Sequence, residues 1–138
     1  MFFPKKVKYR KWHTMRKNPL KVGVASRGIT VAFGSFGLKA MAPARIKSNQ
    51  IESARKVLSR SIGKTGRLWI RIFPDMPYTQ KPAEVKLGKG KGDLAGYVAP
   101  VLAGRMLFEV DGIDEVMARE ALRKAGTKLP VKTKIVAR

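Results

Sequence analysis

The sequence of 138 residues contains no cysteine and a single histidine, His13. Without cysteine the chain cannot form disulfide bonds, thiolate metal sites or a cysteine nucleophile. The lone histidine lies in a basic segment, which argues against His-based catalytic triads, dyads and metal clusters. The nine Asp and Glu residues are few and scattered, so they offer little for general acid–base chemistry. We therefore predict that the protein is not an enzyme and uses no metal, cofactor or small-molecule substrate.

Long apolar runs are also absent. No run approaches the roughly 20 residues that a membrane span requires, and the first residues lack the apolar core of a secretory signal. We expect no membrane partner. Hydrophobic residues nevertheless make up 44% of the chain, enough for a packed core in one domain over residues 1–138.

Positive charge is what the sequence has in excess. Thirty Lys and Arg face nine acids, which gives a formal net charge of +21, and the first acid is Glu52. An isolated fold gains nothing from such self-repulsion, so a polyanionic partner is expected. Nucleic acid is the first candidate, and an anionic membrane surface is a distant second.

The N-terminal segment over residues 1–27 is basic and predicted to be partly extended. Between Lys5 and Arg16, cations alternate with aromatic and imidazole side chains, a composition that suits RNA because phosphates attract the charge and exposed bases can stack. The alternative is a solvated basic tail with Trp12 packed on the domain. The predicted RNA contacts here are Lys5, Lys6, Lys8, Arg10, Lys11, Trp12, His13 and Arg16.

A second basic segment is the long loop predicted over residues 74–94. Pro74, Pro77 and Pro82 disfavour a helix or a central strand. The loop ends in glycines that alternate with lysines from Gly88 to Gly92, so backbone N–H groups and cations could approach an anion together. The alternative is a flexible basic loop without a partner.

Hydrophobic periodicity predicts helices over 48–62, with Ser48 as the N-cap, and over 114–125. Strands are predicted over 67–73, 95–102, 105–110 and 131–136, with one or two more within 28–41. The 95–102 and 105–110 strands are expected to form a hairpin through Ala103 and Gly104. Gly63 is expected to end the first helix. Without regular βαβ alternation, the fold class is α+β: a single compact domain with a mixed or antiparallel sheet and two main helices.

Several short motifs resemble those of the family of large ribosomal subunit protein sixteen, in its bacterial or organellar form, and they occur in the same order as in that family. The matching stretches cover nearly the whole chain. They are Pro4–Lys11, Phe33–Leu38, Arg45–Ile46, Gln50–Arg55, Trp69–Asp75, Lys81–Pro82, Gly88–Gly92, Phe108–Glu109, Ala118–Ala121 and Lys128–Thr133.

The resemblance implies a structural constituent of the large ribosomal subunit that binds its rRNA, supports subunit assembly and helps to position aminoacyl-tRNA. Its partners would be large-subunit rRNA, tRNA at the aminoacyl site with the peptidyl site as a second candidate, and neighbouring ribosomal proteins. The location would be a ribosome, in the cytoplasm or in an organelle. In several bacterial members the position that matches Lys86 is an arginine that becomes hydroxylated, so that modification is not assumed for the lysine here.

Further rRNA contacts are predicted at Arg45, Lys47, Arg55, Lys56, Arg60 and Arg71. The residues predicted near tRNA are Lys81, Lys86, Gly88, Lys89, Gly90, Lys91 and Gly92. Two other functions remain as alternatives: a nucleic-acid-coating protein of the architectural type and a basic membrane-active protein. The first would bind any duplex equally, and the second would bind liposomes.

Overall fold

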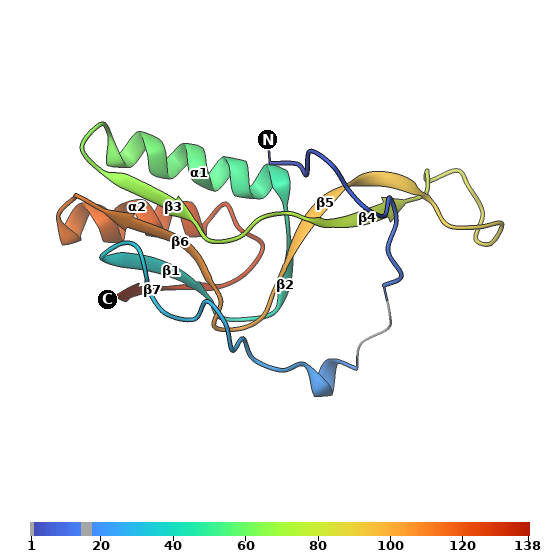
Figure 1. The fold of residues 1–138 in the computed structure, drawn as a ribbon, viewed down its shortest axis with the longest axis horizontal. Helices are drawn as coiled ribbons and strands as arrows, with labels where there is room; N and C mark the ends of the chain where they lie inside the picture. Colours follow the sequence, from blue (N-terminus) through green and yellow to red (C-terminus); the bar gives the residue numbers. More distant parts are fainter. Residues whose placement is uncertain (1, 15–17) are drawn as a thin grey trace.

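The computed structural model describes residues 2–14 and 18–138 (Figure 1). The regular elements are a 3₁₀ turn, η1 (Pro19–Lys21), followed by β1 (Phe36–Ala40), β2 (Ala44–Lys47), α1 (Ser48–Ile62), β3 (Arg67–Ile70), β4 (Met76–Gln80), β5 (Asp93–Val101), β6 (Met106–Asp111), α2 (Glu115–Gly126) and β7 (Thr133–Ala137). The predicted α+β class with two main helices is confirmed.

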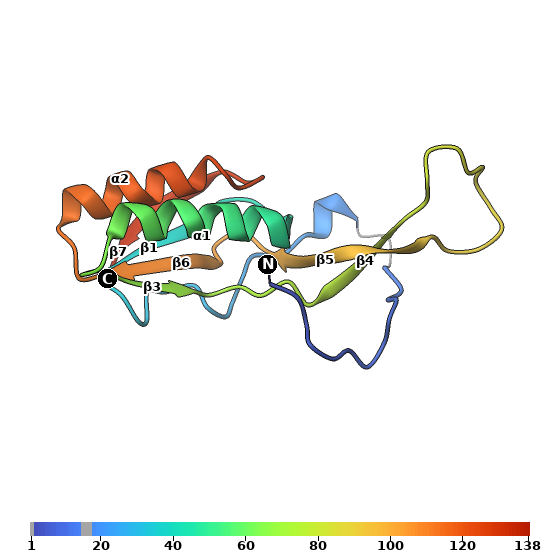
Figure 2. The ribbon, with the colours of Figure 1, turned by 90° about the horizontal axis from the view of Figure 1, so that it is seen from above.

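The strands form two antiparallel sheets. One has the order β3-β6-β1-β7 and the other the order β2-β5-β4. Helices α1 and α2 pack against each other on one face of the four-stranded sheet (Figure 2). The β4–β5 ribbon leads away from the helices and ends in the loop over residues 81–92 (Figures 1 and 2).

The core lies between the helices and the four-stranded sheet. Each helix contributes one stripe of apolar side chains at intervals of three or four residues, as helical periodicity requires. The stripes are Ile51, Ala54, Leu58 and Ile62 on α1, and Ala118, Ala121, Leu122 and Ala125 on α2. Strand β6 lies between β3 and β1, and its residues from Met106 to Val110 are all buried. Both predicted helices are thus present, and Val57 and Ser61, which flank the stripe on α1, are half-buried.

The start of α1 differs from the prediction. The N-cap is Lys47, and Ser48 is a buried first residue of the helix. The Lys47 backbone N–H donates to Gln50 Oε1 at 2.9 Å, so the side chain of the third helical residue satisfies the amide of the N-cap residue. At the other end, Gly63 adopts φ +70°, which confirms the predicted helix stop.

The predicted hairpin between residues 95–102 and 105–110 is wrong. Strands β5 and β6 belong to different sheets, and Ala103 and Gly104 turn the chain from one sheet to the other. Gly104 has φ +98°, and its N–H donates to Ala40 O at 2.7 Å, so the turn is tied to β1. Periodicity within a strand identifies the strand but not its partner, and here long-range pairing decided the topology.

The region predicted as a loop over 74–94 contains β4. This strand is at the edge of its sheet, where Pro77 is tolerated because an edge strand leaves one row of N–H groups without a ladder partner. The segment between β4 and β5 is therefore shorter than predicted, spanning residues 81–92. The predicted strand over 67–73 is also shorter and ends at Ile70.

Candidate nucleic-acid interface

The N-terminal segment lies along the β4–β5 ribbon (Figures 1 and 2). The ring of Phe3 meets Tyr97 of β5 edge to face, with centroids 5.9 Å apart. Lys11 Nζ lies 3.6 Å from Asp93 Oδ1, and Lys91 Nζ donates to the carbonyl of Trp12. These contacts bring the N-terminal segment beside the end of the lysine-rich loop and the start of β5, which lie about 80 residues later in the sequence.

The cations of this segment face solvent. Lys5, Lys6, Lys8 and Arg10 are exposed, while Lys11 is half-buried beside Asp93. Tyr9 and Trp12 are 63% and 41% exposed, so both offer aromatic surface to a base, although Lys8 Nζ lies over the Tyr9 ring, 5.6 Å from its centroid. His13 is also exposed. The predicted contact Arg16 lies outside the described residues.

The loop over 81–92 has an unusual backbone. Gly88, Lys89 and Gly90 take successive positive φ angles of +94°, +58° and +99°, and Lys89 is the only non-glycine with positive φ among the described residues. Gly92 has a different role: it lets the backbone of the loop pass close to the backbone of β4, because a Cβ there would lie 2.8 Å from the carbonyl carbon of Gln80. Lys81 Nζ donates to Gly88 O across the loop. Lys86, Lys89 and Lys91 are exposed, so the loop presents cations on a backbone that glycine permits.

A third basic region is formed by β2 and α1. Arg45 and Lys47 are exposed on β2, and Lys47 Nζ lies 5.6 Å from the centroid of Tyr78. Lys56 and Arg60 are exposed on α1. Arg55 differs from them, because it is bound to Glu52 at 2.6 Å and is therefore less free to meet a phosphate. Its hydrogen bond lowers the pKa of Glu52.

Arg71 has a role that the sequence did not predict. Its guanidinium is paired with the buried carboxylate of Glu109 and lies 5.0 Å from the ring centroid of Phe33, which stacks on Trp69. The side chain of Arg71 is only 18% exposed. It therefore holds segments of the fold together, unlike the exposed cations described above.

Glu109 is the centre of this arrangement. Its carboxylate accepts hydrogen bonds from the N–H groups of Ala32, Phe33 and Gly34, at 2.6 to 3.2 Å. Burial by itself would raise the pKa of Glu109, but the three N–H donors and the Arg71 guanidinium outweigh burial, and the pKa is lowered. The carboxylate thus stays ionised and anchors the segment before β1 to β6.

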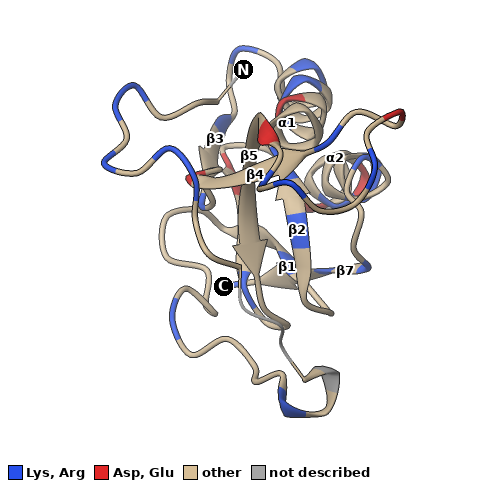
Figure 3. Ribbon diagram, turned by 90° about the vertical axis from the view of Figure 1, so that its right-hand side faces the viewer, with Lys and Arg blue, Asp and Glu red and all other residues tan. Residues whose placement is uncertain are grey.

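Acids elsewhere are mostly paired with neighbours. On α2, Glu115 binds Arg119 at 2.7 Å, and Glu120 binds Arg123 at 2.9 Å and Lys124 at 3.5 Å. The hydrogen bond from Arg123 lowers the pKa of Glu120 to about 2. Helix α2 therefore balances its own charge, while most cations of the N-terminal segment and the β4–β5 loop are exposed. Figure 3 shows Lys and Arg along that segment and that loop, and residues of both signs on α2.

Within residues 2–14 and 18–138, no group of three or more His, Asp or Glu side chains is placed to hold a metal ion. In the same part of the chain, neither helix has the length and apolar character needed to cross a bilayer. The fold and its surface together define a strongly basic α+β protein that presents cations on an extended segment, a glycine-lysine loop and one helix.

The family model for ribosomal protein L16p/L10e matches residues 4–136. Curated relatives named large ribosomal subunit protein uL16 are 54% identical in Afipia carboxidovorans and 55% identical in Rhodopseudomonas palustris, each alignment covering the whole chain and 98% of the relative. The relative of the same name from Thermosipho africanus is 54% identical over the whole chain and 94% of its own length. The chain belongs to the ribosomal protein L16p/L10e family.

Membership confirms the resemblance drawn from the sequence motifs. The protein is a structural constituent of the large ribosomal subunit and not an enzyme. What sequence reasoning missed is the joining of the N-terminal segment to the loop through Lys11 and Lys91, because no local pattern reports contacts between such distant residues. It also missed the Glu109 anchor, for which the only signal was a lone acid within an apolar strand pattern.

Proposed function

We propose that this protein binds large-subunit rRNA through two surfaces and contacts tRNA through a third. The exposed cations of the N-terminal segment and those of β2 and α1 bind rRNA phosphates. The β4–β5 loop, with Lys81, Lys86, Lys89 and Lys91, reaches tRNA at the aminoacyl site, and the peptidyl site is the second candidate. In this way the protein supports subunit assembly and tRNA positioning.

The observation that carries the proposal is the separation of paired and unpaired charge. On α2 the acids and cations pair within the helix, whereas Lys5, Lys6, Lys8 and Arg10 face solvent. Unpaired cations on extended segments release counterions when they meet phosphates, and this release supplies most of the affinity for nucleic acid. Exposed Tyr9 and Trp12 add faces on which unpaired bases can stack.

Sucrose-gradient sedimentation of ribosomes that carry a tagged copy tests the proposal. The tagged protein should remain with the large subunit through a moderate-salt wash and leave it as salt rises further. Migration at the top of the gradient, or with bulk nucleic acid, would contradict rRNA binding in the subunit. For the tRNA contact, the same subunits should show weaker aminoacyl-site tRNA binding when the loop lysines are replaced.

A further inference from the structure

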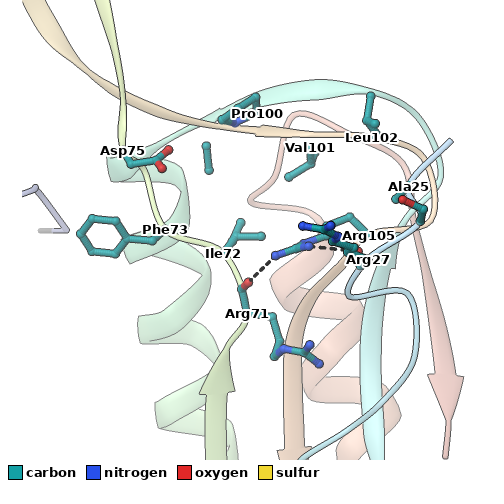
Figure 4. A pocket seen from close by; sticks show the side chains of 12 residues that line it. Ala25, Arg27, Arg71, Ile72, Phe73, Asp75, Pro100, Val101, Leu102 and Arg105 are labelled. Carbon is teal, nitrogen blue, oxygen red and sulfur yellow. Dashed lines mark hydrogen bonds between the residues drawn. The ribbon is translucent and has the colours of Figure 1, made fainter. Parts of the chain in front are cut away.

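A cleft lies where three segments of the chain meet (Figure 4). The segments are residues 25–27, the link from β3 to β4, and the end of β5 with the turn into β6. The volume of the cleft is about 540 Å³, within the range of small-ligand sites. Ile72, Val101 and Leu102 form an apolar wall.

The arginine side of the cleft is held in place by the backbone. Arg105 donates from Nη1 to Arg27 O at 3.0 Å and from Nη2 to Arg71 O at 3.4 Å. Gly28 lies directly against this guanidinium, since a Cβ there would be 2.7 Å from Nη1. Arg105 has further N–H donors beyond these two, and the exposed Arg27 side chain stands beside it. The two arginines form a site for an anionic group.

Asp75 lines the same cleft from the β3–β4 link (Figure 4). Seven of the nine acids in the chain have a side-chain hydrogen bond or ion pair in the described residues, namely Glu52, Asp93, Glu109, Asp111, Asp114, Glu115 and Glu120. Asp75 and Glu84 do not have one there. Asp75 is therefore a carboxylate that shares a cleft with arginines without pairing with them.

We propose that this cleft binds one unstacked guanosine of rRNA. Arg27 and Arg105 hold its phosphate, the apolar wall packs against the base, and the Asp75 carboxylate accepts from the base edge. A carboxylate can only accept hydrogen bonds, and guanine offers two adjacent N–H donors, from N1 and from the 2-amino group. Because Asp75 repels phosphate, it also sets which end of the nucleotide enters on its side. The inference rests on the proposed rRNA binding and names one ligand within it.

Chemical probing of large subunits tests the site in its natural setting. Kethoxal adds to N1 and the 2-amino group of accessible guanine, so it reports the two atoms that Asp75 would occupy. We expect one guanine, protected in subunits with the unchanged protein, to become reactive in subunits with Asp75→Asn. Subunits with Glu84→Gln lose the same charge at the other unpaired acid and should keep the protection. If no guanine differs between Asp75→Asn and the unchanged protein, the proposal is overturned.

A binding measurement on the full-length protein gives the base preference directly. Uridine oligomers of about ten nucleotides would carry one central guanosine, inosine, adenosine or cytidine. Guanosine should bind on the order of tenfold more tightly than adenosine or cytidine, and inosine, which lacks the 2-amino group, should fall between them. Asp75→Asn should remove this preference, whereas Arg27→Ala should weaken all oligomers alike.

The outcomes separate the two proposals. Equal binding of all oligomers, with the protein still retained on large subunits, overturns the guanosine site and leaves rRNA binding intact. Loss of retention on the subunit together with no binding to any oligomer overturns both. Because Asp75 is exposed, its replacement should leave the melting temperature unchanged, which a thermal scan of each variant checks.

Discussion

At the scale of single residues, Glu109 is the one charged residue that is buried in the described part of the chain. It is fully buried, accepts from three backbone N–H groups and pairs with Arg71. A charge in such a position is stable only when its partners are all present, because an uncompensated partner left behind in the interior is costly. Replacing it should therefore disturb the segment from Ala32 to Gly34 as well as β6.

We expect Glu109→Gln to lower the free energy of unfolding by about 3 kcal/mol near neutral pH. Because the folded pKa of Glu109 lies below its unfolded value, its stabilisation is full above the unfolded pKa of about 4.3 and is lost as pH falls through the folded pKa. The stability difference between the two proteins should shrink over that acidic range. Urea unfolding at a series of pH values measures it, and a pH-independent difference would contradict the ionised carboxylate.

Gly34 is a second residue whose identity is set by its surroundings. A Cβ at this position would lie 2.5 Å from the carbonyl oxygen of Val110, in the backbone of β6. We expect Gly34→Ala to destabilise the protein by about 1–3 kcal/mol, the usual effect of overpacking. Gly23→Ala is the matched control, since no atom would lie within 4 Å of its Cβ. Thermal unfolding of both variants is the measurement, and equal melting temperatures would be contrary to expectation.

Residue-level roles were only partly predictable from the sequence. Exposed cations such as Lys5 and Lys56 could be identified by composition and helix periodicity. Arg71 is predicted as an rRNA contact together with them, and the structure shows its guanidinium bound to a buried acid nearly 40 residues away. A pattern within one strand says which face a residue occupies but not what covers that face.

At the scale of elements, the β4–β5 loop combines charge with a backbone that glycine makes possible. Replacing Lys89 and Lys91 with alanine should reduce tRNA binding at the aminoacyl site on the order of tenfold, since the two proposed phosphate contacts would be lost. Both lysines are exposed, and the contact of Lys91 with the Trp12 carbonyl involves only the N-terminal segment and not the core, so the melting temperature should change little. Filter binding of tRNA to reconstituted subunits measures the first effect.

The control for this experiment is the pair Lys64→Ala and Lys128→Ala, which removes the same charge from exposed positions outside the loop. Its tRNA binding should stay close to that of the unchanged protein. If both double variants lost affinity equally, general charge and not the loop would be responsible. A large fall in melting temperature for the loop variant would instead indicate a structural role.

Elements were predicted more reliably than their partners. Both helices followed from hydrophobic spacing, and Gly63 marked the end of α1, although its N-cap is Lys47 and not the predicted Ser48. The β5–β6 hairpin is not present. At the turn between these strands, the Gly104 N–H donates to Ala40 O of β1, and β6 pairs with β1 and β3 in the other sheet. Strand β4 was missed because proline disfavours a strand except at the edge of a sheet, and the sequence does not show that β4 is an edge strand.

At the scale of the whole molecule, the excess of cations should appear in the salt dependence of RNA binding. Deleting residues 1–16 removes six Lys and Arg. We expect the slope of log affinity against log salt to fall by up to about 4, at about 0.7 per cation on single-stranded RNA. The control is Arg119→Gln with Arg123→Gln, two cations that are paired on α2 and should barely affect the slope. An unchanged slope after the deletion would rule out the segment as a phosphate contact.

The order of the four-stranded sheet has a consequence for how the chain is made. In the order β3-β6-β1-β7, no two neighbouring strands are consecutive in sequence, and the central strand β6 begins at Met106. Long-range pairing of this kind is slow to form. During synthesis the sheet cannot be completed until β7, at Thr133–Ala137, has left the ribosome that makes it, which requires nearly the whole chain of 138 residues. The cation-rich N-terminal segment is thus exposed to RNA before the domain that carries it has folded. Nascent chains should therefore need protection from premature RNA binding until β7 has emerged.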